Sequence, residues 1–160
     1  MAATIIDGFE IARQVREEVA NKTAELKTKG INPCLAVILV GENPASVSYV
    51  TGKQKALAEV GMLDKSIKLP ESTSEEELLA LIDQLNKDDS VHGILVQLPL
   101  PKHINEQKVI LAISPDKDVD GFHPVSVGNL VIGNKSYLPC TPHGIIVLLQ
   151  KMGIETNGKN

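Results

Sequence analysis

The sequence predicts an α/β fold: a three-layer α/β/α arrangement with a mainly parallel sheet in the middle. Three short segments, 34–40, 65–69 and 91–98, have the character of strands and alternate with segments in which apolar residues repeat at helical spacing. Segment 34–40 is apolar throughout, which is typical of a strand covered on both faces. Strands that alternate with helices are joined by right-handed crossovers, so we expect them to run parallel.

Four segments carry the apolar spacing and the end signals of helices: 8–29, 44–60, 74–85 and 142–151. Gly30 and Gly61 follow the first two, at a position where a left-handed glycine commonly ends a helix. Ser74 and Glu77 have capping-box spacing at the start of the third. The stretch 115–133 is rich in proline and glycine and is expected to form loops beside the sheet, where sites are often built.

The composition fits one folded domain. A chain of 160 residues buries roughly 70% of the surface that its unfolded form exposes, so it can fold without disulfides or metals. Cys34 and Cys140 lie far apart and outside any Cys/His cluster, which indicates free thiols in a reducing compartment. No segment approaches the roughly 20 apolar residues of a membrane span, and the first residues lack a secretion signal. We therefore expect a cytoplasmic protein that does not bind membranes.

Charge and aromatic content argue against nucleic-acid binding. The net charge is −4, and acidic and basic residues are interspersed, so no basic stripe is available for a phosphate backbone. The chain has two Phe, two Tyr and no Trp, which is too few for a platform that stacks successive bases. We expect no nucleic-acid partner.

Lys53 lies on a helix face that the apolar pattern predicts to be buried. Tyr49 is one turn earlier on the same stripe. The apolar members of the stripe are Ala56, Leu57 and Val60. An amine held among apolar side chains loses its proton more easily than in water, and such a group can act as a base near neutral pH. The alternative is a lysine whose stem packs on the core while its charged end reaches water.

Gln97 and Asp120 are candidates for the same site. In an open parallel sheet, ligands bind beyond the carboxyl ends of the strands, where Gln97 and the early turns of helix 44–60 should meet. A buried Gln97 amide needs partners such as an amine or a ligand, although it could equally bond a loop at the strand end. Asp120 could accept two hydrogen bonds from an amino-substituted heterocycle, and an Asx-turn is the alternative.

Other binding motifs are absent or incomplete. Asp116, Asp118 and Asp120 superficially resemble a calcium loop, but the glycine position and the missing downstream glutamate do not fit an EF-hand, so we expect no metal site. The chain lacks Gly-x-Gly-x-x-Gly, and Asn134 interrupts a possible P-loop. Tyr-x-x-x-Lys also occurs in short-chain dehydrogenases, but their N-terminal glycine-rich turn is missing here.

Four motifs occur in order along the chain: Tyr-Val-Thr-Gly-Lys-Gln-Lys-Ala at 49–56, Val-Gln-Leu-Pro-Leu-Pro at 96–101, Lys-Asp-Val-Asp-Gly-Phe-His-Pro at 117–124 and Pro-Cys-Thr-Pro-His-Gly at 139–144. Together they closely resemble the bifunctional methylenetetrahydrofolate dehydrogenase/cyclohydrolase family, FolD. The resemblance covers essentially the whole chain but only the N-terminal part of such an enzyme. Ser126 departs from the family pattern, which has asparagine there.

The resemblance implies a two-step reaction. 5,10-Methylenetetrahydrofolate gives a hydride to NADP, and water then opens the resulting 5,10-methenyltetrahydrofolate to 10-formyltetrahydrofolate. NADP would be bound mainly by a C-terminal Rossmann domain that is absent from this chain. Residues 1–141 are then expected to form the folate-binding catalytic domain, and residues 142–160 the interdomain helix and a truncated linker. Full-length members of the family are homodimers, which leaves open whether this fragment is a monomer.

The resemblance also implies roles for individual residues. Lys53 would assist proton movement, and Gln97 would hydrogen-bond it. Tyr49 would stack on the folate, and Asp120 would anchor the pterin. The remaining assignments are Val96, Leu98 and Pro99 for the folate slot, and Cys140 and Thr141 for the nicotinamide side of NADP.

Two other interpretations remain open. The chain could be a non-catalytic folate-binding or interaction module that kept the fold. It could also be the substrate domain of another dehydrogenase with a similar sheet, although the 96–101 and 139–144 motifs argue against that.

Overall fold

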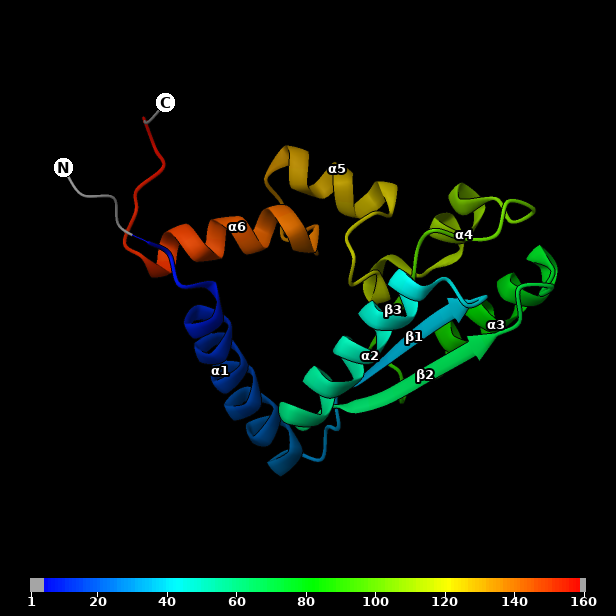
Figure 1. Cartoon of the computed structure of the whole chain (residues 1–160), viewed down its shortest axis with the longest axis horizontal. Coiled ribbons are helices and arrows are strands. Elements are labelled where there is room, and N and C mark those ends of the chain that lie inside the picture. Colours follow the sequence, from blue (N-terminus) through cyan, green and yellow to red (C-terminus); the bar gives the residue numbers. More distant parts are fainter. Residues whose placement is uncertain (1–4, 159–160) are drawn as a thin grey trace.

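A three-stranded parallel sheet in the order β2-β1-β3 forms the centre of the computed structural model, which describes residues 5–158 (Figure 1). The strands are β1 (Cys34–Val40), β2 (Leu63–Leu69) and β3 (Gly93–Val96). β1 pairs with β2 from Cys34↔Leu63 and with β3 from Leu35↔Gly93, both in parallel. The predicted α/β class with a parallel sheet is therefore confirmed.

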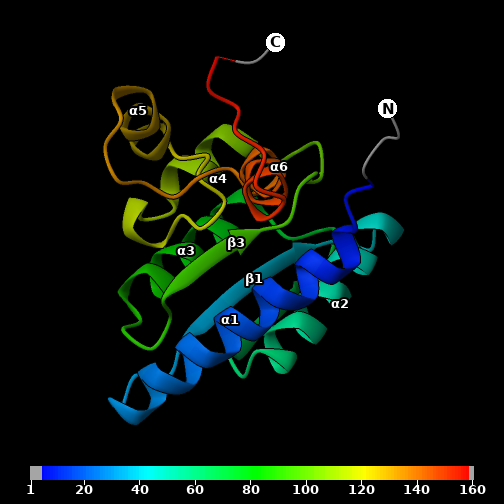
Figure 2. The same cartoon turned by 90° about the vertical axis from the view of Figure 1, so that its left-hand side faces the viewer.

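Helices cover both faces of this sheet (Figure 2). α1 (Gly8–Thr28) and α2 (Pro44–Glu59) lie on one face, and α3 (Glu75–Lys87) and α4 (Glu106–Ala112) lie on the other. Successive β1 side chains alternate between two buried clusters, as a strand with two covered faces requires. One cluster contains Val37, Leu39, Val50 and Leu95, and the larger contains Ala36, Ile38, Val40, Leu78, Ile82, Ile94 and Val96.

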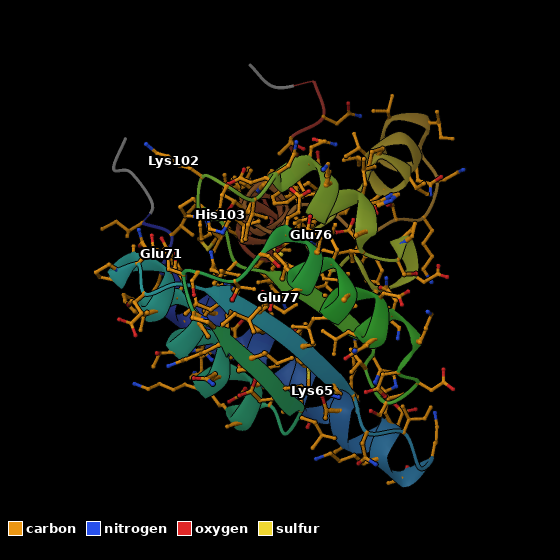
Figure 3. The ribbon with its side chains drawn as sticks, turned by 90° about the vertical axis from the view of Figure 1, so that its right-hand side faces the viewer. Lys65, Glu71, Glu76, Glu77, Lys102 and His103 are labelled. Carbon is orange, nitrogen blue, oxygen red and sulfur yellow. The ribbon has the colours of Figure 1, made fainter. Side chains whose placement is uncertain are left out.

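Local sequence signals account for the helix ends. Asn43 caps α2 by accepting from two backbone N–H groups, and Pro44 follows at the first helical position. At α3 the Ser74 and Glu77 side chains each bond the other's backbone N–H, as the capping box predicts. Glu76 and Glu77 place acidic groups at the N-terminal end of α3 (Figure 3), where the helix dipole favours them.

Several predicted boundaries differ from the structure. β3 covers only Gly93–Val96 instead of 91–98, although the Gln97 N–H still donates to the Ile38 carbonyl. The ladder cannot continue further because Pro99 has no N–H to donate. β2 begins two residues before the predicted start at 65.

The stretch 115–133 is more regular than predicted. A short 3-10 helix, η1 (Pro115–Lys117), is followed by the helix α5 (Pro124–Ile132), so the loop-rich stretch that the sequence predicts contains a helix that was not expected. His123 caps α5 through its Nδ1, and Gly133 ends it with φ of 78°. α6 (Cys140–Lys151) also begins before the predicted 142.

α5 and α6 lie together on the β3 side of the sheet, away from β2 (Figures 1 and 2). The far end of α6 contacts α1 through an ion pair of Lys151 with Glu18. The domain boundary predicted between 141 and 142 falls inside α6, and both predicted ranges reach residues outside the described ones, at 1–4 and 159–160. Across residues 5–158, no helix is long and apolar enough to cross a membrane.

Candidate functional site

Lys53 and Gln97 meet where the sequence places them, at the carboxyl edge of the sheet. Lys53 Nζ donates to Gln97 Oε1 at 3.1 Å, and Gln97 Nε2 donates to the Leu98 carbonyl at 2.8 Å. Because the Gln97 amide nitrogen donates to the Leu98 carbonyl, the Gln97 amide oxygen faces the Lys53 amine and accepts from it. Gln97 is therefore both a partner of Lys53 and a strand-end residue bonded to a loop, the two alternatives that the sequence left open.

Tyr49 presents an open aromatic face beside this amine. Lys53 Nζ lies 5.7 Å from the centroid of the ring, within the range of a cation–π contact. The ring residue is 66% exposed, Lys53 is half-buried, and Val60 at the far end of the stripe is buried. The prediction that this face is buried therefore holds only for its later part. Ser46 and Val50 in the same early turns are buried against the sheet, so Tyr49 lies at the margin of the buried face of α2.

Asp120 brings a carboxylate to the same place. Burial raises the pKa of the Asp120 carboxyl, nearby Lys53 opposes this rise, and Asp118 adds to it. Within residues 5–158 the Asp120 side chain accepts no hydrogen bond, so it is not the Asx-turn residue that was considered as an alternative. A half-buried carboxylate that no protein donor satisfies is available to the donors of a ligand.

The turn bonds belong to Asp118 instead. Its carboxylate accepts from Phe122 N at 3.4 Å, from His123 N at 2.9 Å and from the Ser126 hydroxyl at 2.8 Å. Its backbone carbonyl accepts from Gly121 N at 3.2 Å. Sequence reasoning assigned Asp118 no role. Asp at the first position of a turn and Gly at the fourth is a type I turn signal, which could have identified it.

Gly93 lets this turn lie against β3. A Cβ at position 93 would stand 2.5 Å from Val119 Cγ1 and 3.2 Å from Leu35 Cδ1. The backbone of Ile94 also forms an isolated parallel bridge with Asp118. The segment that carries Asp120 is thus held against the edge strand because position 93 has no side chain.

Cys140 extends the site toward α6. A groove of about 440 Å³ is lined by Lys53, Asp120 and Cys140 together with mostly apolar side chains. Cys140 Sγ lies 3.9 Å from the Val119 carbonyl. Burial raises the pKa of the Cys140 thiol, Asp120 adds to the rise, and Lys53 opposes it, so all three groups are within electrostatic reach. Thr141 is the next residue of α6 and is exposed.

The predicted folate-slot residues are only partly brought together. Val96 is 5% exposed and belongs to the core under α3 and α4, on the sheet face opposite α2. Leu98 is half-buried and lines a small hollow with Val96 and Asp120, whereas Pro99 is exposed. Leu98 and Val96 thus share a hollow with Asp120, and neither lines the groove that contains Lys53.

The remaining polar residues of the cluster have structural partners. His123 is buried and caps α5, and Asp116 is exposed. Lys117 Nζ donates to the carbonyls of Leu85 and Asp88 at the end of α3. Among residues 5–158, no three His, Cys, Asp or Glu side chains are grouped in a way that could hold a metal ion.

Known proteins share this sequence and geometry. Residues 6–120 match the family described as tetrahydrofolate dehydrogenase/cyclohydrolase, catalytic domain. The chain is 60% identical over 159 residues to the bifunctional protein FolD of Moorella thermoacetica, which covers 99% of this chain and 57% of that relative.

Solved structures agree. The bifunctional FolD methylenetetrahydrofolate dehydrogenase/cyclohydrolase of Campylobacter jejuni is 51% identical with a TM-score of 0.94, over 96% of this chain and 55% of that one. The FolD enzyme of Trypanosoma brucei, complexed with NADP cofactor and inhibitor, is 36% identical with a TM-score of 0.93, over 99% and 55%. The chain spans about half the length of these relatives. Because the family match covers most of its residues, the chain belongs to the tetrahydrofolate dehydrogenase/cyclohydrolase family and corresponds to its catalytic domain.

Proposed function

We propose that this chain is the folate-binding catalytic part of a bifunctional enzyme of one-carbon metabolism. The enzyme oxidises 5,10-methylenetetrahydrofolate to 5,10-methenyltetrahydrofolate with NADP and hydrolyses the product to 10-formyltetrahydrofolate. The observation that carries the proposal is the convergence at one sheet edge of an amine, an open aromatic face and a carboxylate without a protein donor among the described residues, in Lys53, Tyr49 and Asp120.

These groups match the chemistry of a reduced folate. The exposed Tyr49 ring offers a flat surface on which an aromatic portion of the substrate can stack. The Asp120 carboxylate can accept two N–H groups from the amino-pyrimidine edge of a pterin, in the bidentate way that carboxylates prefer. Gln97 accepts a hydrogen bond from the Lys53 amine and so helps to fix its position.

Lys53 is the proton carrier of the hydrolytic step. Water adds to the methenyl carbon and loses a proton, the carbon–N5 bond breaks, and N5 gains a proton as the formyl carbonyl forms. One proton is released overall. A lysine amine within reach of both the water and N5 can take the first proton and return one to nitrogen. Its hydrogen bond to Gln97 holds that amine in place.

NADP, when bound, accepts the hydride of the oxidation step. Cys140 and Thr141 suit its nicotinamide side, because Cys140 borders the same groove as Lys53 and Asp120 while Thr141 is exposed next to it. These 160 residues contain no glycine-rich phosphate loop. The rest of NADP would therefore be held by a part corresponding to the half of the relatives' length that this chain does not cover. We place the enzyme in the cytoplasm, where its free cysteines would stay reduced, and expect a homodimer for the full-length form.

The binding half of the proposal is tested on the chain itself. Titration calorimetry with 5-formyltetrahydrofolate, a stable reduced folate, should give saturable heat for the wild type. Asp120→Ala and Tyr49→Ala should each weaken binding by about tenfold or more, since a charge-assisted bidentate contact and a stacking surface each contribute roughly 1–3 kcal/mol. Absence of binding by the folded wild type would exclude the folate site.

The catalytic half is tested in a protein of the relatives' full length. The chain is joined to the C-terminal remainder of the Moorella thermoacetica relative, and loss of methenyltetrahydrofolate absorbance is followed for wild type, Lys53→Met and Lys55→Met. Lys55 is exposed on the same helix and serves as the matched control. Hydrolysis should be lost only in Lys53→Met. Equal rates in all three would remove Lys53 from the mechanism and favour a non-catalytic folate-binding module.

A further inference from the structure

A buried carboxylate two residues before Asp120 has no part in the proposed chemistry. Asp118 is 3% exposed, and among residues 5–158 no lysine, arginine or histidine forms a salt bridge with it. A carboxylate removed from water in this way is costly unless hydrogen bonds replace its hydration. Three donors do so here, two from the backbone and one from the Ser126 hydroxyl, which is itself 3% exposed.

The hydrogen bonds of Asp118 close a loop that contains Asp120, the residue proposed to bind the ligand. Asp118 accepts from Phe122 N and His123 N through its carboxylate, and from Gly121 N through its carbonyl, so the chain from 118 to 123 is closed around Asp120. Ser126 adds a bond from the first turns of α5. The donors of this loop are therefore used on one carboxylate, and the neighbouring carboxylate is left free.

The same loop is locked against the start of α6. Gly121 has φ of 68°, and a Cβ there would be 2.9 Å from the Tyr137 carbonyl oxygen and 3.0 Å from Pro139 N. The Ser136 hydroxyl donates to the Ser126 carbonyl at 2.9 Å. Displacement of the loop would thus move both Asp120 and the segment that leads into Cys140.

We propose that Asp118 and Ser126 are positioning residues that act through Asp120: their buried hydrogen bond fixes the loop so that the Asp120 carboxylate faces Lys53 with its acceptor sites unoccupied. The expected effect on folate affinity rests on the proposed function, whereas the effect on the position of Asp120 does not. Ser126 matters because its hydroxyl is the only side-chain donor to Asp118 within the described residues.

The test removes the hydroxyl. Ser126→Ala keeps the backbone donors to Asp118 and loosens the attachment of the loop to α5. Ser90→Ala is the matched control, because the Ser90 hydroxyl also donates to an aspartate, Asp88, but on an exposed turn before β3. Titration of the Asp120 carboxyl is followed by carbon-13 NMR, with Asp120→Asn identifying the resonance, and affinity for 5-formyltetrahydrofolate is measured by calorimetry.

The pH at which the Asp120 carboxyl titrates depends on its position relative to the charged groups around it. Its charged and titratable neighbours are Lys53 from α2, Asp118 from its own loop and Cys140 from α6. In Ser126→Ala a more hydrated Asp120 should titrate at lower pH than in the wild type, and affinity should fall about three- to tenfold, the effect of one lost hydrogen bond. Ser90→Ala should leave both unchanged.

The outcomes separate the two proposals. If Ser126→Ala is less stable but titrates and binds like the wild type, Ser126 is merely structural and the inference is overturned. If the wild type does not bind the folate, the proposed function fails, and the Asp120 titration still decides the inference. If Ser126→Ala does not fold, Ser126→Cys replaces it, because the thiol keeps the size and donates only weakly. The same lower titration and weaker binding are then expected.

Discussion

Replacement of Gly93 by alanine tests how the site is held to the sheet. The new Cβ would stand 2.5 Å from Val119 Cγ1, whereas ordinary contacts begin at 3.4 Å. The strand and the segment before Asp120 must therefore separate by about 1 Å, in an interior that has little free volume to absorb it. Leu35 Cδ1, at 3.2 Å, is the flexible end of a side chain and can move by the smaller amount required.

The magnitude follows from two opposing effects. Overpacking of this kind costs typically 1–3 kcal/mol. Alanine also recovers roughly 0.5–1 kcal/mol of the backbone entropy that glycine loses on folding. We expect Gly93→Ala to lower the free energy of unfolding by about 1–2 kcal/mol, which corresponds to about 3–6 °C in melting temperature for a chain of this length. Affinity for 5-formyltetrahydrofolate should fall in parallel, because Asp120 directly follows the displaced Val119.

A double-mutant cycle isolates the clash. Val119→Ala removes the Cγ1 methyl, so Gly93→Ala/Val119→Ala should be more stable than the sum of the single effects predicts, by about 1 kcal/mol or more. Gly128→Ala in α5 is the control, since nothing lies within 4 Å of a Cβ there and the helix should gain stability. Urea unfolding of the four proteins measures the cycle. Wild-type stability of Gly93→Ala, or strictly additive effects in the double variant, would refute the contact as the reason for glycine.

Three further predictions concern charge, capping and the core. Because burial raises the pKa of the Asp120 carboxyl above its ordinary 3.8, the folded chain binds this proton more tightly than the unfolded chain, and stability falls as pH rises through the two values. Asp120→Asn should therefore melt at higher temperature than the wild type at neutral pH, and the difference should vanish well below pH 3.8. Ser74→Ala should cost about 1 kcal/mol in urea unfolding through loss of the capping box. Ile82→Ala should cost about 2–5 kcal/mol, since Ile82 is fully buried; a smaller loss would show that the core around α3 collapses into the cavity.

The parts of the fold that follow from local chemistry could be predicted. Segment 34–40 has no polar residue to place on a wet face, so a doubly covered strand was the only consistent interpretation, and it is correct to the residue. The capping box at Ser74 likewise needs only four residues to be recognised. Both signals are complete within a short window of sequence.

α5 was missed because its signals are ambiguous in sequence. Pro124 and Gly133 are typical of loops, yet proline in the first turn and glycine just past the end are also typical of the start and end of a helix. Which meaning applies depends on His123, whose ring accepts the Val125 N–H only once the loop before it has folded. The shortened β3 has a similar cause, since pairing to β1, and not apolarity, decides where a strand ends.

The candidate site divides in the same way. Lys53, Tyr49 and Gln97 could be brought together from sequence because helical spacing and the sheet-edge rule each act on one element at a time. The role of Asp118 could not, because its bonds depend on a loop that wraps back to β3 beside Gly93. Val96 was assigned to the folate slot through the resemblance alone, and its position in the strand places it on the opposite face.

Asp118 and Asp120 differ in a way that connects stability to binding. Both are removed from water to some degree, but the loop directs its hydrogen bonds to Asp118 and none to Asp120. A chain selected only for stability would satisfy or neutralise Asp120, as the expected gain in Asp120→Asn implies. A ligand that brings two N–H donors to Asp120 replaces the hydration that the carboxylate loses on burial. It does so without displacing a protein donor. The same arrangement that makes Asp120 costly in the free chain therefore favours a ligand with paired donors, and the amino-pyrimidine edge of a pterin has that pattern.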